Sequence, residues 1–140
     1  MTLDQDTVVL RLGIMNDLLG DLESIGEVDA SLLRSDRITR HALERILTQL
    51  VDLAVAINAH VAAAAGSVPG TYRESFVAAA DSGFIPVDLA ERLAPSAGLR
   101  NILTHEYVEV DLALVATAAR TARVDYRAYV ESVARALAAR

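Results

Sequence analysis

The fold is decided by the stretch RHALERILTQLVDLAVAINAH, residues 40–60. Its apolar residues recur at intervals of three and four, at Leu43, Ile46, Leu47, Leu50, Val51, Ala54 and Ile57. This spacing places them on one face of an α-helix. We therefore expect a long helix over about residues 35–65. It should end at GSVPGT, where Gly66 suits a left-handed cap and Pro69 cannot continue a helix.

A second helix is expected upstream, over about residues 4–24, with Asp4 or Thr2 as its cap. Its apolar stripe consists of Val8, Leu12, Met15, Leu18, Leu19 and Leu22. The segment SIGEVDASLL, residues 24–33, then interrupts the pattern and has room for a short turn of helix.

Downstream, the pattern predicts short helices over about residues 72–81 and 86–93, separated by DSGF. Residues 95–98 form another break, where Ser96 is a candidate cap for the next helix. A last helix is expected over about residues 111–138, capped by Asp111. The sequence has no convincing strand, repeat or linker. It predicts an all-α bundle, one domain spanning residues 1–140, with two or three long helices and short connecting helices.

Composition limits the function. The 140-residue chain has no cysteine, which removes disulfides and thiolate chemistry, and its net charge of −6 opposes sequence-independent attraction of nucleic acid over the whole surface. A local arginine-lined site stays possible. The N-terminal MTLDQDTVV lacks a basic signal region, and Asn58 and His60 interrupt the longest apolar tract, residues 53–65. We expect a soluble, cytoplasmic protein without a membrane contact.

The residues that carry chemistry gather in GLRNILTHEYVEVD, residues 98–111. On an ideal helix, Arg100, Asn101 and His105 share a polar sector beside an apolar one, whereas Glu106 would fall in the apolar sector. We therefore expect the helix to loosen or end near residues 105–108, which would leave His105 and Tyr107 on a turn.

Histidine exchanges protons near neutral pH, and arginine carries a permanent charge suited to phosphate. Together they suit cleavage of RNA by its own 2′-hydroxyl, a reaction that needs no metal and excludes DNA. Arg100 and His105 diverge by about 140° on a straight helix, so either the turn redirects His105 or a second copy completes the pocket. From the residues alone, surface salt bridges and a hydrogen-bonded helix end are the favoured explanation of the segment.

The motif Arg100–Asn101–Ile102–Leu103–Thr104–His105–Glu106–Tyr107 resembles the signature of the HepT family, small toxins of the HEPN superfamily. The likeness continues upstream through residues 72–98 and in the long helix at residues 40–60. The first 30 residues and the last helix match only in helical character.

This resemblance implies a metal-independent endoribonuclease toxin that acts as a homodimer, without a cofactor, and is neutralised by an MntA-type nucleotidyltransferase antitoxin. It implies that Arg100 and His105 are catalytic, that Asn101 supports the polar site, and that Tyr107 accepts AMP from the partner. AMP there would place negative charge where RNA phosphate must bind. The alternative is a non-catalytic HEPN interaction module that docks a nucleotidyltransferase.

Other polar residues have a functional and a structural interpretation. His60 with Asp52 would need further ligands to hold a metal, and a hydrogen-bonded histidine is the simpler interpretation. His41 is interpreted as a solvated residue at a helix start, and Tyr72 with Arg73 either borders an RNA groove or packs structurally. One side of the last helix could touch RNA or form a solvated face, through Arg120, Arg123 and Arg127.

Overall fold

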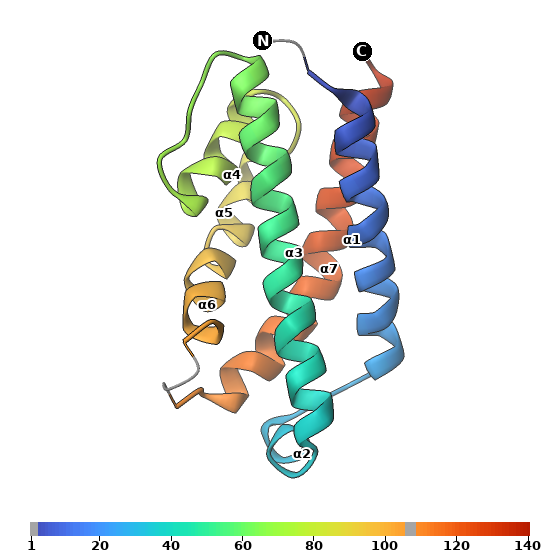
Figure 1. The fold of residues 1–140 in the computed structure, drawn as a ribbon, viewed down its shortest axis with the longest axis vertical. Helices are drawn as coiled ribbons and strands as arrows, with labels where there is room; N and C mark the ends of the chain where they lie inside the picture. The colour runs from blue at the N-terminus through green and yellow to red at the C-terminus, as the bar shows by residue number, and fades with distance from the viewer. Residues whose placement is uncertain (1–2, 106–108) are drawn as a thin grey trace.

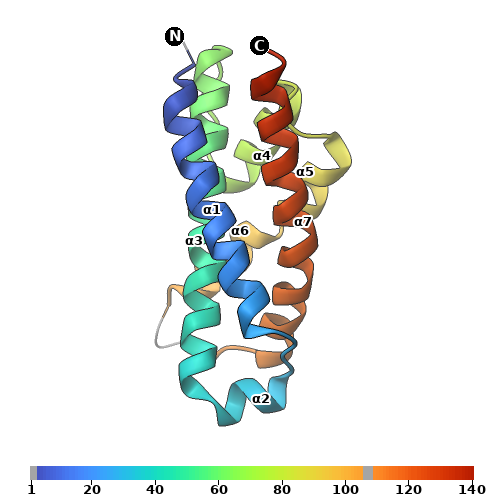
Figure 2. The same ribbon diagram turned by 90° about the vertical axis from the view of Figure 1, so that its right-hand side faces the viewer.

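Three long helices run side by side in a computed structural model, which describes residues 3–105 and 109–140. They are α1 (Gln5–Ile25), α3 (Arg37–Ala64) and α7 (Leu112–Ala138). The short helix α2 (Ala30–Ser35) joins α1 to α3 at one end of the bundle (Figures 1 and 2). Between α3 and α7 the chain forms α4 (Tyr72–Asp81), α5 (Val87–Leu93) and α6 (Ser96–Leu103). The described part of the chain contains no strand, and the predicted all-α bundle is confirmed.

Aspartate side chains cap the N-termini of the three long helices. The carboxylate of Asp4 accepts a hydrogen bond from the backbone N–H of Thr7, and Asp36 accepts one from Thr39. Asp111 caps α7 in the same way, as the sequence predicts. The hydrogen bonds from Thr39 hold the pKa of Asp36 below its ordinary value. These caps set the helix starts to within about two residues of the predicted positions.

The C-terminus of α3 is closed by the expected glycine. Gly66 has a φ of 84°, which only glycine adopts without strain. Its N–H donates to the carbonyl of Ala63 at 3.0 Å, and the N–H of Ser67 donates to the carbonyl of Ala62 at 2.8 Å. This pair of bonds is the Schellman motif, so the predicted left-handed cap is confirmed.

The core lies where α1, α3 and α7 face one another, and α3 also contacts α2, α4 and α6. All the predicted apolar positions of α3 are buried, and so is the whole predicted stripe of α1. Burying a leucine or isoleucine stabilises a fold by about 1.5–3 kcal/mol. The three- and four-residue spacing of these side chains therefore explains both the helices and their packing.

A series of hydrogen bonds between polar groups crosses this apolar core. The hydroxyl of Tyr129 on α7 lies 2.7 Å from Oδ1 of Asn58 on α3. The amide nitrogen of Asn58 donates to Oγ of Ser75 on α4 at 3.2 Å, and Ser75 donates to the carbonyl of Tyr72 at 2.6 Å. Burial raises the pKa of Tyr129 well above its ordinary value, so the hydroxyl keeps its proton. This series of hydrogen bonds fixes α4 against α3 and α7, and the sequence analysis did not predict it.

By length and composition, α3 is apolar enough to cross a membrane, with a mean hydropathy of 1.5 over its most apolar window. A core helix of a soluble protein meets the same criteria. Within the bundle, 56% of that window is buried.

Candidate functional site

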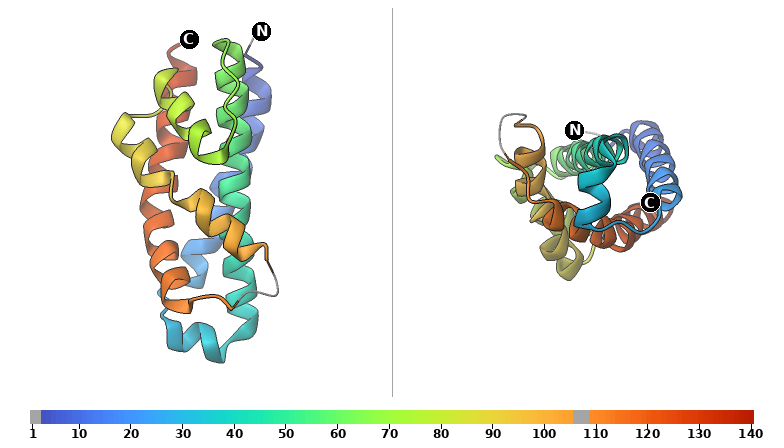
Figure 3. Two further views of the ribbon diagram at one scale, coloured as in Figure 1. Left: turned by 90° about the vertical axis from the view of Figure 1, so that its left-hand side faces the viewer. Right: turned by 90° about the horizontal axis from the view of Figure 1, so that it is seen from below.

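The motif predicted to carry chemistry lies on α6, which crosses obliquely over α3 and α7 (Figure 3, left). On the side of α6 that faces the bundle, Ala97 is buried, and Leu99 and Leu103 pack against the core. Asn101 and Ile102 are exposed on the opposite side. These apolar contacts attach α6 to the bundle, and the residues on its outer side remain accessible to solvent.

The start of α6 differs from the prediction. Ser96 does not cap the helix, because Ala94 and Pro95 already have α-helical dihedral angles, and the N-cap position is Pro95. The hydroxyl of Ser96 instead donates to the carbonyl of Leu93 at 2.6 Å and contacts the hydroxyl of Tyr126 at 2.7 Å. Ser96 is therefore an anchor that fixes α6 to α7.

The regular helix ends at Leu103, slightly before the predicted residues 105–108. Thr104 donates its hydroxyl to the carbonyl of Asn101 at 3.1 Å, and Nδ1 of His105 hydrogen-bonds to the same carbonyl. Because a carbonyl only accepts, this contact places a proton on Nδ1. His105 therefore lies on a turn beyond the helix, as expected. Glu106 and Tyr107 lie outside the described residues.

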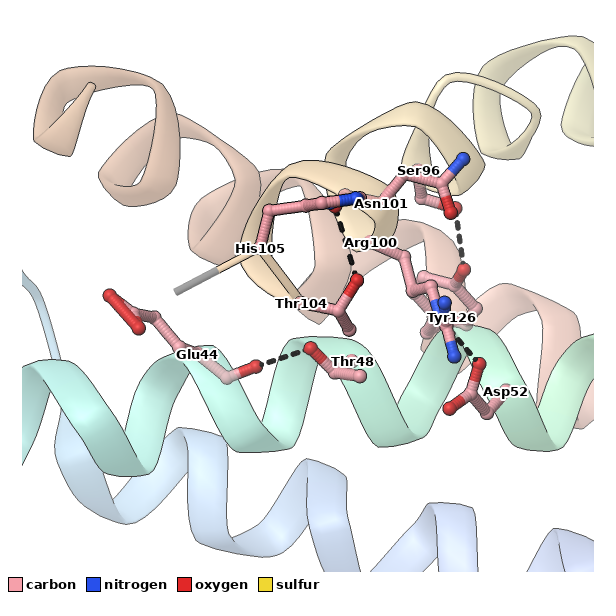
Figure 4. Close-up of polar contacts among 9 residues, drawn as sticks. All are labelled: Glu44, Thr48, Asp52, Ser96, Arg100, Asn101, Thr104, His105 and Tyr126. Carbon is pink, nitrogen blue, oxygen red and sulfur yellow. Dashed lines mark hydrogen bonds and ion pairs between the residues drawn. The ribbon is translucent and has the colours of Figure 1, made fainter. Parts of the chain in front are cut away.

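Arg100 points towards α3 (Figure 4). Its Nε donates to a carboxylate oxygen of Asp52 at 2.9 Å, and its guanidinium carbon lies 5.4 Å from the ring centre of Tyr72. The hydrogen bond to Asp52 raises the pKa of Arg100 above its already high ordinary value. Both partners are partly exposed, so the pair stabilises the fold by only about 0–1 kcal/mol. Its main effect is to orient the cation.

Within one chain, Arg100 and His105 do not line the same cavity. Arg100 borders an apolar cavity of about 200 Å³ between α6 and α7, whereas His105 lines a separate groove of about 780 Å³. Leu103 contributes to the walls of both. Asn101 contacts His105 through its backbone carbonyl. The divergence expected from helix geometry is therefore present within a single chain.

The remaining two histidines make different contacts. Nε2 of His60 accepts a hydrogen bond of 2.9 Å from the backbone N–H of Asp4, as the structural interpretation of His60 predicts. Asp52, the other half of the metal interpretation, pairs with Arg100 instead. His41 is exposed near the start of α3 and lines the same groove as His105.

The arginines of α7 do not form a simple solvated face. The side chain of Arg123 is only 15% exposed, pairs with Glu27 at 3.1 Å and donates to the carbonyl of Gly26. Arg120 donates to the carbonyl of Val28 at 3.5 Å. Together with Arg127 they line a shallow groove that also contains Glu23, Glu27 and Glu131. Arg123 therefore ties α7 to the end of α1, and the solvated-face interpretation is wrong for it.

Sequence reasoning missed the two partners of Arg100. The sequence suggests Asp52 only as a metal ligand, and Tyr72 only as a groove or packing residue. One signal was present: Glu44, Thr48 and Asp52 recur every four residues on α3, and α6 lies along this row (Figure 4). Residues at this spacing lie on one face of a helix, so the sequence marks a polar row on α3.

Solved structures share this fold. A tri-AMPylated HEPN toxin from Shewanella oneidensis, in complex with an MNT antitoxin, superposes with a TM-score of 0.82 at 20% sequence identity, covering 93% of this chain and 98% of that one. YutE, a cytosolic protein of unknown function from Bacillus subtilis, gives a TM-score of 0.84 at 16% identity, covering 99% and 94%. At these identities the likeness is one of fold, and it places the chain in the class of HEPN-type helical bundles.

Sequence comparison narrows that class. The model of the ribonuclease HepT-like family matches residues 15–133. A tRNA nuclease HepT from Aphanizomenon flos-aquae is 34% identical over 124 residues, which cover 88% of this chain and 84% of that protein. The chain belongs to the ribonuclease HepT-like family, as the resemblance at residues 98–111 indicated.

Proposed function

We propose that the protein is a metal-independent endoribonuclease toxin, with Arg100 and His105 as catalytic residues and Asn101 in support. His105 transfers a proton during attack of the RNA 2′-hydroxyl, and Arg100 stabilises charge on the phosphoryl oxygens. The observation that carries this proposal is that a partly exposed arginine on α6 and an exposed histidine on the turn just beyond it stand five residues apart, in a chain of the ribonuclease HepT-like family. The Aphanizomenon flos-aquae relative is named a tRNA nuclease, so tRNA is the first substrate to test.

A homodimer would complete the site. Within one chain, Arg100 faces Asp52 and Tyr72 while His105 lines a different groove. Two copies related by a twofold axis can place Arg100 of one beside His105 of the other, because a twofold interface uses the same surface twice. Ile102, 39% exposed between these residues, supplies apolar surface for such a contact.

The partner we propose is an MntA-type nucleotidyltransferase antitoxin. The structurally similar Shewanella oneidensis toxin is tri-AMPylated and in complex with an MNT antitoxin. Transfer of AMP to Tyr107 would put a phosphate beside the Arg–His site and block RNA. Toxin and antitoxin would act in the cytoplasm, where tRNA is present.

The activity is tested with protein purified without its partner and incubated with tRNA in EDTA. We expect cleavage that leaves a 2′,3′-cyclic phosphate, because the 2′-hydroxyl is the nucleophile and no metal takes part. An RNA with a single 2′-deoxy nucleotide at the cut site should resist. If the protein does not cleave tRNA and its intact mass shows no attached AMP, the result would favour the non-catalytic interaction module instead.

Replacing Tyr107 by phenylalanine separates silencing from catalysis. The Tyr107→Phe variant lacks the hydroxyl that would accept AMP, so we expect it to stay toxic when co-expressed with the nucleotidyltransferase, while the parent protein is neutralised. Intact mass should show AMP on the parent chain only. Loss of cleavage in the unmodified variant would contradict a purely regulatory tyrosine and give Tyr107 a part in the reaction.

A further inference from the structure

The groove that His105 lines is built by an end of the bundle to which the motif assigns no role. Residues from α2, α3 and the segments around α6 and α7 form it, with a volume of about 780 Å³. Its basic members are Arg34 at the end of α2 and Arg40, His41 and Arg45 in the first turns of α3. The described lining contains no Phe, Tyr or Trp.

Two of these cations are available for a ligand. Arg34 and Arg45 are exposed, and neither has a salt bridge with another residue in the described ranges. Among the described residues that line it, the groove has three arginines against two glutamates, in a protein whose net charge is −6. The described lining therefore carries a small excess of positive charge although the molecule as a whole is acidic.

Arg40 contacts two other residues that line the groove. Its Nε lies 3.4 Å from a carboxylate oxygen of Glu44, and its Nη2 lies 3.3 Å from Nε2 of His41. Because a guanidinium only donates, Nε2 of His41 is the acceptor in this contact. The Nε atom of Arg40 is buried without a hydrogen bond of good geometry. Arg40 therefore holds Glu44 and His41 in place, and Arg34 and Arg45 keep their charge for a ligand.

We propose that this groove binds the phosphate backbone of the RNA strand next to the scissile bond, with Arg34 and Arg45 as phosphate contacts. This inference rests on the proposed ribonuclease function and adds a subsite to it. Guanidinium groups match the paired oxygens of a phosphate. Contacts to phosphate position a strand without reading its sequence.

The test measures tRNA binding in a His105→Ala background, which prevents cleavage during the titration. Arg34→Gln combined with Arg45→Gln should raise the Kd on the order of tenfold in moderate salt. The slope of log K against log salt concentration should become shallower by about 0.7–0.9 for each phosphate that the variant can no longer neutralise. Fluorescence anisotropy between about 50 and 200 mM salt gives both quantities, because such effects are large over that range.

The matched control removes the same charge elsewhere, as Arg37→Gln combined with Arg135→Gln, since both arginines are exposed and lie outside the groove. An equal change in Kd and slope in this control would overturn the subsite, because net charge alone would explain the effect. An unchanged slope in the groove variant would also overturn it, even if the wild type cleaves tRNA. The expected slope change in the groove variant, together with a wild type that binds tRNA but never cleaves it, would support the subsite and refute the catalytic proposal.

Discussion

Replacing His105 with alanine is expected to lower the rate of tRNA cleavage by about 10²–10⁴-fold, the usual contribution of a proton-transfer group. The imidazole stands on a turn just beyond α6, with Nδ1 hydrogen-bonded to the carbonyl of Asn101. The side chain is exposed and does not belong to the apolar core, so its removal should leave the fold intact. The loss should appear in kcat, measured in EDTA on end-labelled tRNA, with little change in the circular dichroism spectrum.

His60 supplies the matched control. It is also a partly exposed, hydrogen-bonded histidine, but it contacts Asp4 near the other end of α3. The His60→Gln variant keeps a side-chain acceptor for the N–H of Asp4 and should cleave tRNA at the parental rate. If both variants lose activity equally, His105 has no special role; if neither loses activity, the catalytic assignment of His105 is wrong.

Tyr129→Ala should be the most damaging single change to stability, at about 3–5 kcal/mol. The ring is fully buried and makes edge contacts with Phe76 and Tyr126, at centroid distances of 6.4 and 6.3 Å. Its loss opens a cavity and removes the hydroxyl partner of Asn58. Because the free energy of unfolding of native domains is only about 5–15 kcal/mol, this change would remove much of it. Urea unfolding followed by circular dichroism measures the change.

The Tyr129→Phe variant isolates the hydroxyl. It keeps the ring and should cost about 1–3 kcal/mol, because Oδ1 of Asn58 is left buried with one partner fewer. A phenylalanine variant as stable as the parent would mean that the hydroxyl contributes nothing. An alanine variant no less stable than the phenylalanine one would mean that the ring packing contributes nothing.

The helices were predictable because their signals are local. Apolar spacing, Asp4, Asp111 and Gly66 each act within one or two turns of the chain, and each lies where expected. Ser96 was misjudged because a serine after proline looks like a cap, whereas the backbone before it is already helical. Its real partner, Tyr126, is 30 residues away.

The candidate site was predictable as a set of residue types but not as an arrangement. Arg100, Asn101 and His105 are close in sequence, and the motif identifies them. The pairing of Arg100 with Asp52 joins residues 48 positions apart and depends on how α6 crosses α3. The basic groove likewise joins the start of α3 to the turn at His105. Contacts of this kind follow from helix packing, which a single sequence does not specify.

The two ends of the described chain lie together at one extremity of the bundle, and α2 lies at the other (Figure 1). The groove containing Arg34 and His105 is at the α2 extremity. Anything fused to either end, such as an affinity handle or a fluorophore, thus lies far from the groove that we propose binds RNA. Labelled material can serve in kinetic and titration assays without obstructing the surface being measured.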